Sequence, residues 1–469
     1  MTPPSETAAL RRALAHLPLA PHHAPGEPVD PLGVFTVPTH RNAVDPERPL
    51  VVGNRGMGKS FWAHALLQQG VRDRVAHEFR FPNLRTTRVL FGFNGSDASD
   101  PVAPTPAMLE RQHTDTVWRA VLARAVAHET GFPLPAELVE VVAWVNASPE
   151  AYAQLLTNAD SRLQSQGGRL LLLFDALDRL SPDPARRRRM LQGILRLALV
   201  AQSFRTLRVK LFMRLDEFAD SRLFEFPDAA KLRNHKVDLF WGPDDLYRLL
   251  FHHLRCEALP LHDAGGEDVA GRVHAIAGEF MGAGKKRGRV YSWLPTHLAD
   301  GHGQISPRTF MTAWRVAAEH GEPPETPVDH LGLLEGVRKA SGDRLAELSE
   351  DYPWVRVALE PLRGQEVPIA RESLAELWRT AGTYEQVVQR LQAKDLRLFP
   401  RARPFTSAQL GLFMFGLDHE TDSPDVILLR AMRAIGVVEE RTNNKINIPD
   451  IFRLEAGIFR RGGVQPPRR

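Results

Sequence analysis

One eight-residue run has the residue types and spacing that hold phosphate groups. It is Gly53-Asn54-Arg55-Gly56-Met57-Gly58-Lys59-Ser60, which fits the pattern G-x-x-x-x-G-K-[ST] at every constrained position. Glycines let the backbone curl so that its N–H groups face one point, and Lys59 can reach the β- and γ-phosphates of a nucleotide. The Ser60 hydroxyl can coordinate Mg²⁺. We therefore expect these eight residues, with Phe61 directly after them, to bind ATP and Mg²⁺.

A second candidate is an acid at the end of an apolar run. Leu170–Phe174 is continuously apolar and is followed by Asp175, which is typical of a strand buried on both faces of a parallel sheet. Its carboxyl end lies where open α/β sheets bind ligands. We expect Asp175 to share Mg²⁺ with Ser60, and Asp178 to orient or deprotonate the attacking water. The alternative is two surface acids in a strand-to-helix turn.

Charged residues also follow the next predicted strand, 207–213. Arg214 stands at its end and is a candidate sensor of the γ-phosphate, with a plain capping charge as the alternative. If Asp178 is not the base, Asp216 and Glu217 are the next candidates. Ahead of the first strand, His40 and Arg41 are candidates for contacts to the nucleotide base, and an ordinary connecting segment is the alternative.

The elements that position these residues alternate between strands and helices. Apolar patterning predicts strands at 49–52, 88–93, 169–175, 207–213 and 237–240, and helices at 61–69, 108–129, 136–145 and 149–166. This order predicts an α/β three-layer P-loop NTPase domain with a mostly parallel sheet. From about residue 243 onward, the pattern changes to helices.

The whole chain is expected to contain five parts. They are a flexible arm at 1–31, a P-loop ATPase core at 32–245, a helical lid at 246–325, a helical region without an assigned role at 326–400, and a winged-helix domain with a tail at 401–469. The winged helix is predicted from helices at 407–417 and 425–435 followed by a hairpin within 436–448. Such domains bind DNA or dock proteins. The modest basicity of this part of the chain does not distinguish the two functions.

The amino-acid composition limits the classes of protein to which the chain can belong. Of 469 residues, 43% are hydrophobic and 25% are charged, which argues against wholesale disorder. Cys256 is the only cysteine, so intrachain disulfides and thiolate zinc clusters are excluded and a reducing cytoplasm is favoured. No apolar run approaches the ~20 residues of a membrane-spanning helix. The basic run Arg186–Arg189 is interpreted as a solvated helix face, with a binding patch as the alternative.

With both nucleotide motifs present, the chain resembles the AAA+/STAND side of the P-loop ATPases. The resemblance includes the KAP-type NTPases, whose acidic strand is followed by Asp-Leu-Asp-Arg; here the stretch is Phe174-Asp175-Ala176-Leu177-Asp178-Arg179. The resemblance implies that residues 53–60 are the Walker A loop, Asp175 the Walker B magnesium residue, Asp178 the second acid and Arg214 a sensor 1 residue. It also implies that Arg308, in Ser306-Pro307-Arg308, is a sensor 2 residue that contacts the nucleotide.

This chain also departs from these relatives. The STAND entry motif before the first strand is absent, and Ala176 replaces the acid that KAP proteins usually carry after the magnesium Asp.

The resemblance implies an ATP-binding and hydrolysing switch that couples nucleotide state to assembly or to control of a partner. It further implies a homo-oligomer, with Arg222 or Arg233 completing a neighbour's site, and a protein effector in trans, as in a bacterial antiphage module. One alternative is an ATP-gated DNA-binding regulator or initiator-like protein. Another is a nucleotide-binding scaffold with little hydrolysis.

Overall fold

The computed structural model divides the chain into two compact units, residues 22–240 and residues 1–21 with 241–469. It describes residues 6–18, 30–110, 112, 116–256, 268–283, 288–321, 325–392 and 423–467. The helix expected at 407–417 and residues 1–5 and 19–29 of the expected N-terminal arm lie outside the described residues.

A parallel sheet forms the centre of unit 22–240. Its strands are β1 (Leu50–Val52), β2 (Thr87–Phe93), β3 (Arg169–Phe174), β4 (Leu207–Met213) and β5 (Val237–Asp238). Within the described residues the sheet has five strands in the order β2-β3-β4-β1-β5, and every neighbouring pair is parallel. The predicted parallel α/β architecture is confirmed. Strand β4 lies between β1, which precedes the phosphate loop, and β3, which precedes Asp175.

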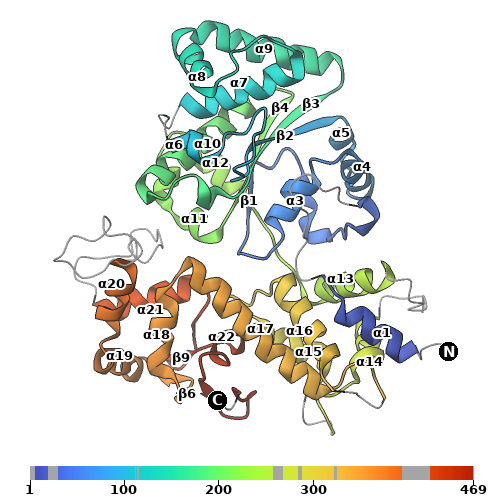
Figure 1. Ribbon diagram of the computed structural model, residues 1–469, viewed down its shortest axis with the longest axis vertical. Coiled ribbons are helices and arrows are strands. Elements are labelled where there is room, and N and C mark those ends of the chain that lie inside the picture. The colour runs from blue at the N-terminus through green and yellow to red at the C-terminus, as the bar shows by residue number, and fades with distance from the viewer. Residues whose placement is uncertain are drawn as a thin grey trace. The chain divides into compact units, whose positions relative to one another are not determined.

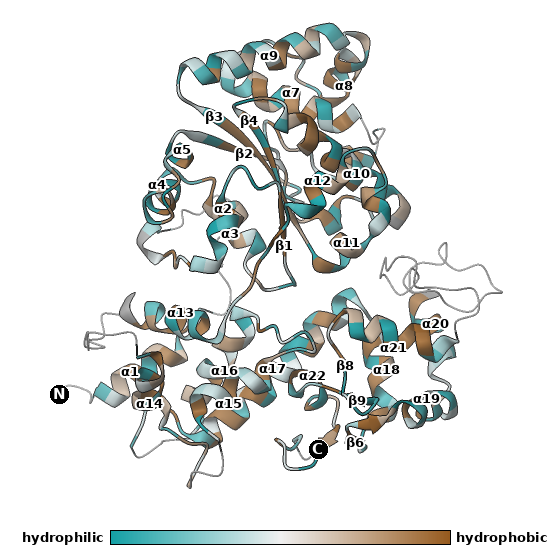
Figure 2. Ribbon diagram, turned by 180° about the vertical axis from the view of Figure 1, so that it is seen from behind, coloured by the Kyte–Doolittle hydropathy of each residue, from teal (hydrophilic) through white to brown (hydrophobic). Residues whose placement is uncertain are grey.

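Helices cover both faces of this sheet. They are α2 (Arg41–Val44), α3 (Lys59–Ala65), α4 (Gln69–Glu78), α5 (Pro82–Arg85), α6 (Pro106–Glu110), α7 (Thr116–Thr130), α8 (Leu138–Ala147), α9 (Pro149–Ser165), α10 (Pro184–Gln202), α11 (Leu215–Ala219) and α12 (Ala229–Asn234). Figure 1 shows α3, α4 and α5 on one side of the sheet and α6, α10 and α12 on the other. The strands between them are predominantly hydrophobic (Figure 2), as a sheet covered on both faces requires.

Aromatic side chains fix the packing of α7 on the sheet. The indole of Trp118 meets the rings of Phe93 and Phe174 edge-on, with ring centroids 6.4 and 5.5 Å apart. Its Nε1 donates a hydrogen bond of 2.9 Å to the carbonyl of Met190 on α10. The buried indole therefore has the polar partner that it needs. Gly92 is required beside it, because a Cβ there would lie 2.4 Å from the Phe174 ring.

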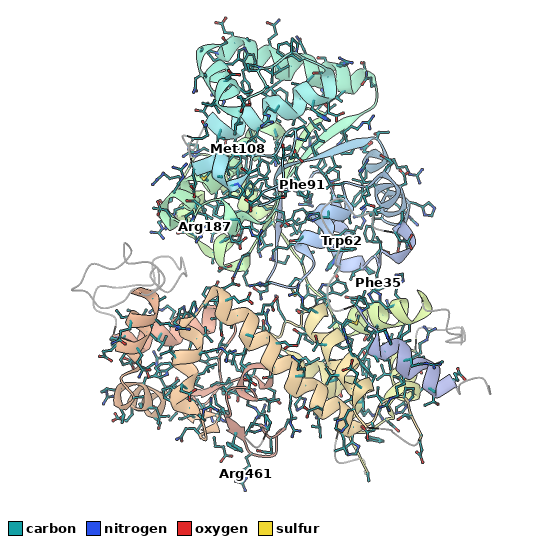
Figure 3. All side chains as sticks on the ribbon, in the orientation of Figure 1. Phe35, Trp62, Phe91, Met108, Arg187 and Arg461 are labelled. Carbon is teal, nitrogen blue, oxygen red and sulfur yellow. The ribbon has the colours of Figure 1, made fainter. Side chains whose placement is uncertain are left out.

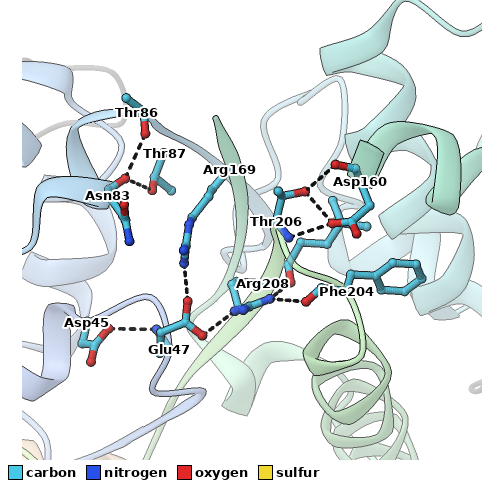
Figure 4. A network of polar contacts seen from close by, with 11 residues as sticks. Asp45, Glu47, Asn83, Thr86, Thr87, Asp160, Arg169, Phe204, Thr206 and Arg208 are labelled. Atoms are coloured by element: carbon cyan, nitrogen blue, oxygen red, sulfur yellow. Dashed lines mark hydrogen bonds and ion pairs between the residues drawn. The ribbon is translucent and has the colours of Figure 1, made fainter. Parts of the chain in front are cut away.

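A polar network ties together the amino ends of β3 and β4 (Figure 4). Glu47, just ahead of β1, accepts a hydrogen bond of 2.7 Å from Arg208 Nε and also pairs with Arg169. Asp160 of α9 accepts from the backbone N–H of Thr206 at 2.7 Å and from its hydroxyl at 2.6 Å. These contacts secure the strand ends opposite Asp175 and leave the carboxyl ends for the site.

Two predicted helices are corrected by the structure. The helix expected at 61–69 is α3, which ends at Ala65, and α4 starts separately at Gln69. The break is held by Arg72, whose Nη1 donates to the carbonyl of Leu66 at 2.8 Å. The helix expected at 108–129 is likewise divided into α6 and α7.

Some arginines of the basic run Arg186–Arg189 in α10 make contacts within the unit. Arg186 donates to the carbonyl of Leu109, in α6, at 2.6 Å, and Arg188 pairs with Asp220 at 2.8 Å. Figure 3 labels Arg187 among the side chains of the same helix. Two of the four arginines thus have partners within the unit, which argues against a binding patch but departs from the solvated helix face expected for them.

The unit made of residues 1–21 and 241–469 is mainly helical. Its helices are α1 (Glu6–Ala15), α13 (Pro243–Cys256), α14 (Val269–Ala277), α15 (Val290–Leu298), α16 (Pro307–Glu319), α17 (His330–Asp351), α18 (Trp354–Leu359), α19 (Arg371–Thr380), α20 (Thr383–Gln392), α21 (Pro424–Ala434) and α22 (Asp450–Arg453). Its short strands are β6 (Glu366–Val367), β7 (Ile369–Ala370), β8 (Glu439–Glu440), β9 (Lys445–Asn447) and β10 (Phe459–Arg460). None of the helices in the described ranges has the length and apolarity needed to cross a bilayer.

The predicted hairpin is present as β8 and β9, which pair antiparallel around a turn in which Asn444 has φ +60°. Strand β7 pairs antiparallel with the other edge of β9. Within the described residues this gives a three-stranded sheet in the order β7-β9-β8. A strand from the region without an assigned role thus completes a sheet with the C-terminal hairpin, which is the arrangement of a winged helix.

Candidate nucleotide-binding site

The phosphate loop connects β1 directly to α3. Gly56 and Gly58 have φ values of +81° and +99°, a region that glycine enters without steric cost. Gly53 allows close approach, because a Cβ there would lie 3.2 Å from the Cβ of Leu239. Met57 is buried beneath the loop, whereas nothing lies within 4 Å of a Cβ built on Gly58. The loop is therefore packed where Gly53 and Met57 lie and open beside Gly58.

Helix α3 is anchored on the sheet by aromatic contacts. Trp62 and Phe91, labelled in Figure 3, are both buried, and the ring of His64 meets Phe91 edge-on at 5.1 Å. Phe61 packs its ring against Trp62 at 5.3 Å. These contacts fix the direction in which the first residues of α3 leave the loop.

The Lys59 ammonium lies within its own loop. Its Nζ donates to the carbonyl of Gly53 at 2.7 Å and to the carbonyl of Asn54 at 2.9 Å. Burial lowers the pKa of Lys59, and the negative charge of Asp175 opposes that shift. The Lys59 ammonium is therefore held by two carbonyls of its own loop.

Asp175 meets the loop from the end of β3. Asp175 is 3% exposed, and hydrogen bonding by the Ser60 hydroxyl and by the backbone N–H of Ala176 favours its charged form. Burial raises the pKa of Asp175, while the Ser60 bond and the Lys59 charge oppose this. Ala176 turns the chain away with φ +52°. The two motifs therefore meet, although β4 separates their strands.

The pair formed by Ser60 and Asp175 suits a magnesium ion. A hydroxyl and a carboxylate are hard oxygen donors, and Mg²⁺ typically takes one or two protein groups and completes its shell with phosphates and water. Among the described residues, no group of three or more His, Cys, Asp or Glu side chains suited to a metal occurs.

The end of β4 brings three more charged groups to the site. Arg214 Nε pairs with Asp216 at 3.1 Å, and the backbone N–H of Arg214 donates to Glu217 Oε2 at 2.8 Å. The charges of Arg214, Glu217 and Asp216 all shift the pKa of Lys59, so this turn faces the phosphate loop. Asp178 lies in the 3₁₀ turn Leu177–Arg179 and is exposed.

The candidates for base contacts have partners inside the unit. Trp62 Nε1 donates to His40 Nδ1 at 3.0 Å, and His40 Nε2, which then carries the proton, donates to the carbonyl of Phe240 at 3.2 Å. Burial lowers the pKa of His40 to about 4. Arg41 Nε donates to the carbonyl of Phe79 at 3.1 Å. These contacts favour the connecting-segment interpretation.

Three arginines predicted to contact a nucleotide, in their own subunit or in a neighbour, have partners in the structure. Arg308 belongs to unit 241–469, where it pairs with Glu347 at 2.8 Å. Arg222 lies 3.3 Å from the buried carboxylate of Asp220. Arg233 is exposed, with its guanidinium 5.8 Å from the centre of the Phe224 ring. Their roles toward a nucleotide stay predictions.

No family model matches the chain, and no curated protein matches it. Among solved structures, the ORC2 protein of Aeropyrum pernix in ADPNP–ADP complexes shares 14% identity over 86% of this chain and 84% of that chain, with a TM-score of 0.37. The Aeropyrum pernix ORC1 protein in complex with DNA shares 14% identity over 94% and 93%, also at 0.37. Cdc6p from Pyrobaculum aerophilum shares 14% identity over 94% and 95%, at 0.32. Because these TM-scores are low, the description of the fold and of the site rests on the strand order and on the site's own contacts.

Proposed function

We propose that the protein is an AAA+-type P-loop ATPase that binds ATP with Mg²⁺ at residues 53–60 and hydrolyses it. The observation that carries the proposal is that Ser60 of the phosphate loop acts on the buried Asp175 and lowers its pKa. It joins the two motifs across a strand that separates them in the sheet. The alternative, in which Asp175 is only a surface acid, does not account for its burial beside Ser60.

Each residue of the site has a role in this proposal. The backbone N–H groups of the loop hold the phosphates, and Lys59 exchanges its two loop carbonyls for phosphate oxygens. Ser60 and Asp175 would hold Mg²⁺, which would supply positive charge against the negative charge of the phosphates. Arg214 stands at the end of the intervening strand, where it can respond to the γ-phosphate. The chemistry is positioning and charge stabilisation of an attacking water.

A finer proposal rests on the sequence resemblance. The protein would act as a STAND- or KAP-like switch that assembles into a homo-oligomer and controls a protein effector in trans, as in antiphage defence. The stretch from Asp175 to Arg179 supports this group, and Ala176 departs from it. The exposed Arg233 and the half-buried Arg222 are the side chains proposed to reach a neighbour's nucleotide.

DNA binding is a second candidate because of the sheet β7-β9-β8. In a winged helix, the hairpin and the helix before it contact the duplex. Here the hairpin carries Arg441 and the exposed Lys445, but Arg441 pairs with Glu439 and Arg433 pairs with Glu440. Affinity for duplex DNA that falls steeply with salt and weakens in Lys445→Ala would support this function.

The ATPase proposal is tested by removing the loop ammonium. Lys59→Ala should abolish or greatly weaken ATP binding, measured by calorimetry on the folded protein, because the β- and γ-phosphates lose the loop's ammonium. Lys231→Ala is the matched control, because Lys231 is exposed in the same unit and pairs with Asp228. Unchanged affinity in Lys59→Ala would contradict the proposal.

A further inference from the structure

The residue directly after Asp175 cannot act as a base. Ala176 follows Asp175 and has no acid to offer. Asp178 is an exposed side chain in a 3₁₀ turn, where water screens it and leaves its carboxylate mobile. A water attacking the γ-phosphate therefore needs another acid with a fixed carboxylate.

Glu217 has such a carboxylate. It lies in the first turn of α11, which starts at the end of β4, the strand between the two nucleotide motifs. Its Oε2 is held by the N–H of Arg214 at 2.8 Å. Its Oε1 is buried and has no hydrogen-bond partner among the described residues. A buried acceptor without a partner is costly in a folded protein and calls for an explanation.

The surroundings place Glu217 within the site. Its charge acts on Lys59 of α3, and the charge of Asp178, from the turn after β3, acts on Glu217. On its own helix it faces Asp216 and Arg214. Burial first, and then the negative charge of Asp216, raise the pKa of Glu217 to about 7, against the pull of Arg214. A base with a pKa near the working pH is the most effective proton acceptor.

We propose that Glu217 is the general base of ATP hydrolysis, with its unpartnered Oε1 receiving a proton from the attacking water. This inference rests on the proposed ATPase function. The water oxygen forms a bond to Pγ, and the bond from Pγ to the β,γ-bridging oxygen breaks with its electron pair leaving on ADP. The water proton moves to Glu217 and then to phosphate or solvent, which restores the carboxylate. Asp178 then tunes the site through its charge.

The test compares amide variants that keep the shape of each side chain. Glu217→Gln retains a carbonyl oxygen for the Arg214 N–H, so the fold of the turn is preserved. Glu225→Gln, an exposed acid in the same unit, is the matched control. Three quantities are measured for each protein: the affinity for ATP with Mg²⁺, the turnover rate, and the identity of the nucleotide that remains bound after incubation with ATP.

We expect Glu217→Gln to lower turnover by about 10²-fold or more, the range of general base catalysis. Its ATP affinity should stay within a few-fold of wild type, and the bound nucleotide should remain ATP while the wild type holds ADP. Asp178→Asn, the competing assignment, should lower turnover less. Turnover of Glu217→Gln within about threefold of wild type, or loss of its ATP binding, would overturn the inference.

The pH profile separates a base from a merely structural residue. Wild-type turnover should rise with pH as Glu217 loses its proton, and the residual activity of Glu217→Gln should lack that inflexion. Asp216→Asn removes a charge that raises the pKa of Glu217, so it should move the inflexion to lower pH. If wild type hydrolyses ATP and the inflexion survives in Glu217→Gln, the base lies elsewhere. If wild type neither binds nor hydrolyses ATP, the proposed function itself fails.

Discussion

A glycine in α17 should be irreplaceable although no catalytic or binding role is predicted for it. A Cβ on Gly336 would lie 2.2 Å from the carbonyl oxygen of Ala313 and 2.9 Å from its carbonyl carbon, both in the backbone of α16. Neither atom can rotate away, so Gly336→Ala must push the two helices apart. Gly342, in the same helix, is the matched control, because the nearest atom to its added Cβ is Glu455 Oε2 at 3.5 Å.

The two substitutions should change stability with opposite signs. Overpacking a core costs ~1–3 kcal/mol, and Gly336→Ala should be at the upper end because backbone atoms are involved. Replacing a helical glycine by alanine returns ~1 kcal/mol of helix propensity. The net loss at Gly336 is therefore about 2 kcal/mol. Gly342→Ala should gain about 0.5–1 kcal/mol, since only the propensity term applies.

Native-state hydrogen exchange of α17 measures this difference locally, which matters because a chain of two units need not unfold in one step. Amides of α17 should exchange faster in Gly336→Ala and slower in Gly342→Ala than in wild type. Equal protection in all three proteins would refute the reasoning about the contact with Ala313.

Two further predictions concern single side chains. His40 is buried with a pKa of about 4 against 6.5 for a free histidine, so the unfolded state takes up the proton first. Stability should therefore fall as pH decreases from 6.5 through 4, by up to ~3 kcal/mol. When the free energy of unfolding is measured against pH, the His40→Gln variant should not show this loss of stability between pH 6.5 and 4. If Arg222 or Arg233 completes a neighbouring site, ATPase activity per protomer should rise with protein concentration. The corresponding alanine variant should then lose on the order of 10³ in turnover without losing ATP affinity, whereas flat activity across a dilution series would speak against a shared site.

Much of the site could be predicted from sequence because its signals are local. The continuous apolar run 170–174 forecasts β3, and the apolar residues that surround Arg208 and Lys210 forecast β4, with ends that agree to within a residue or two. The meeting of Ser60 and Asp175 follows from two motifs whose chemistry requires a shared ion. Glycines at positions 56 and 58 have the left-handed backbone that the motif implies.

What the sequence left open depends on distant contacts. The end of α3 is fixed by Arg72, and the role of His40 is fixed by Trp62 and Phe240. From the sequence, Glu217 is only a secondary candidate, because its charge acts on Lys59 through the position of β4 in the sheet, which local patterns do not encode. Strand β7 has two residues, too few for a period of two to stand out.

The central claim, a shared magnesium site in which Ser60 contacts Asp175, is tested most directly by a double-mutant cycle. ATP affinity is measured with Mg²⁺ and with chelator for wild type, Ser60→Ala, Asp175→Asn and the double variant. Each single variant should lose the part of the affinity that depends on Mg²⁺ and keep the part that does not. The losses should be non-additive by about 0.5–3 kcal/mol, as for residues in contact. Additive losses, or equal losses in chelator, would contradict the claim.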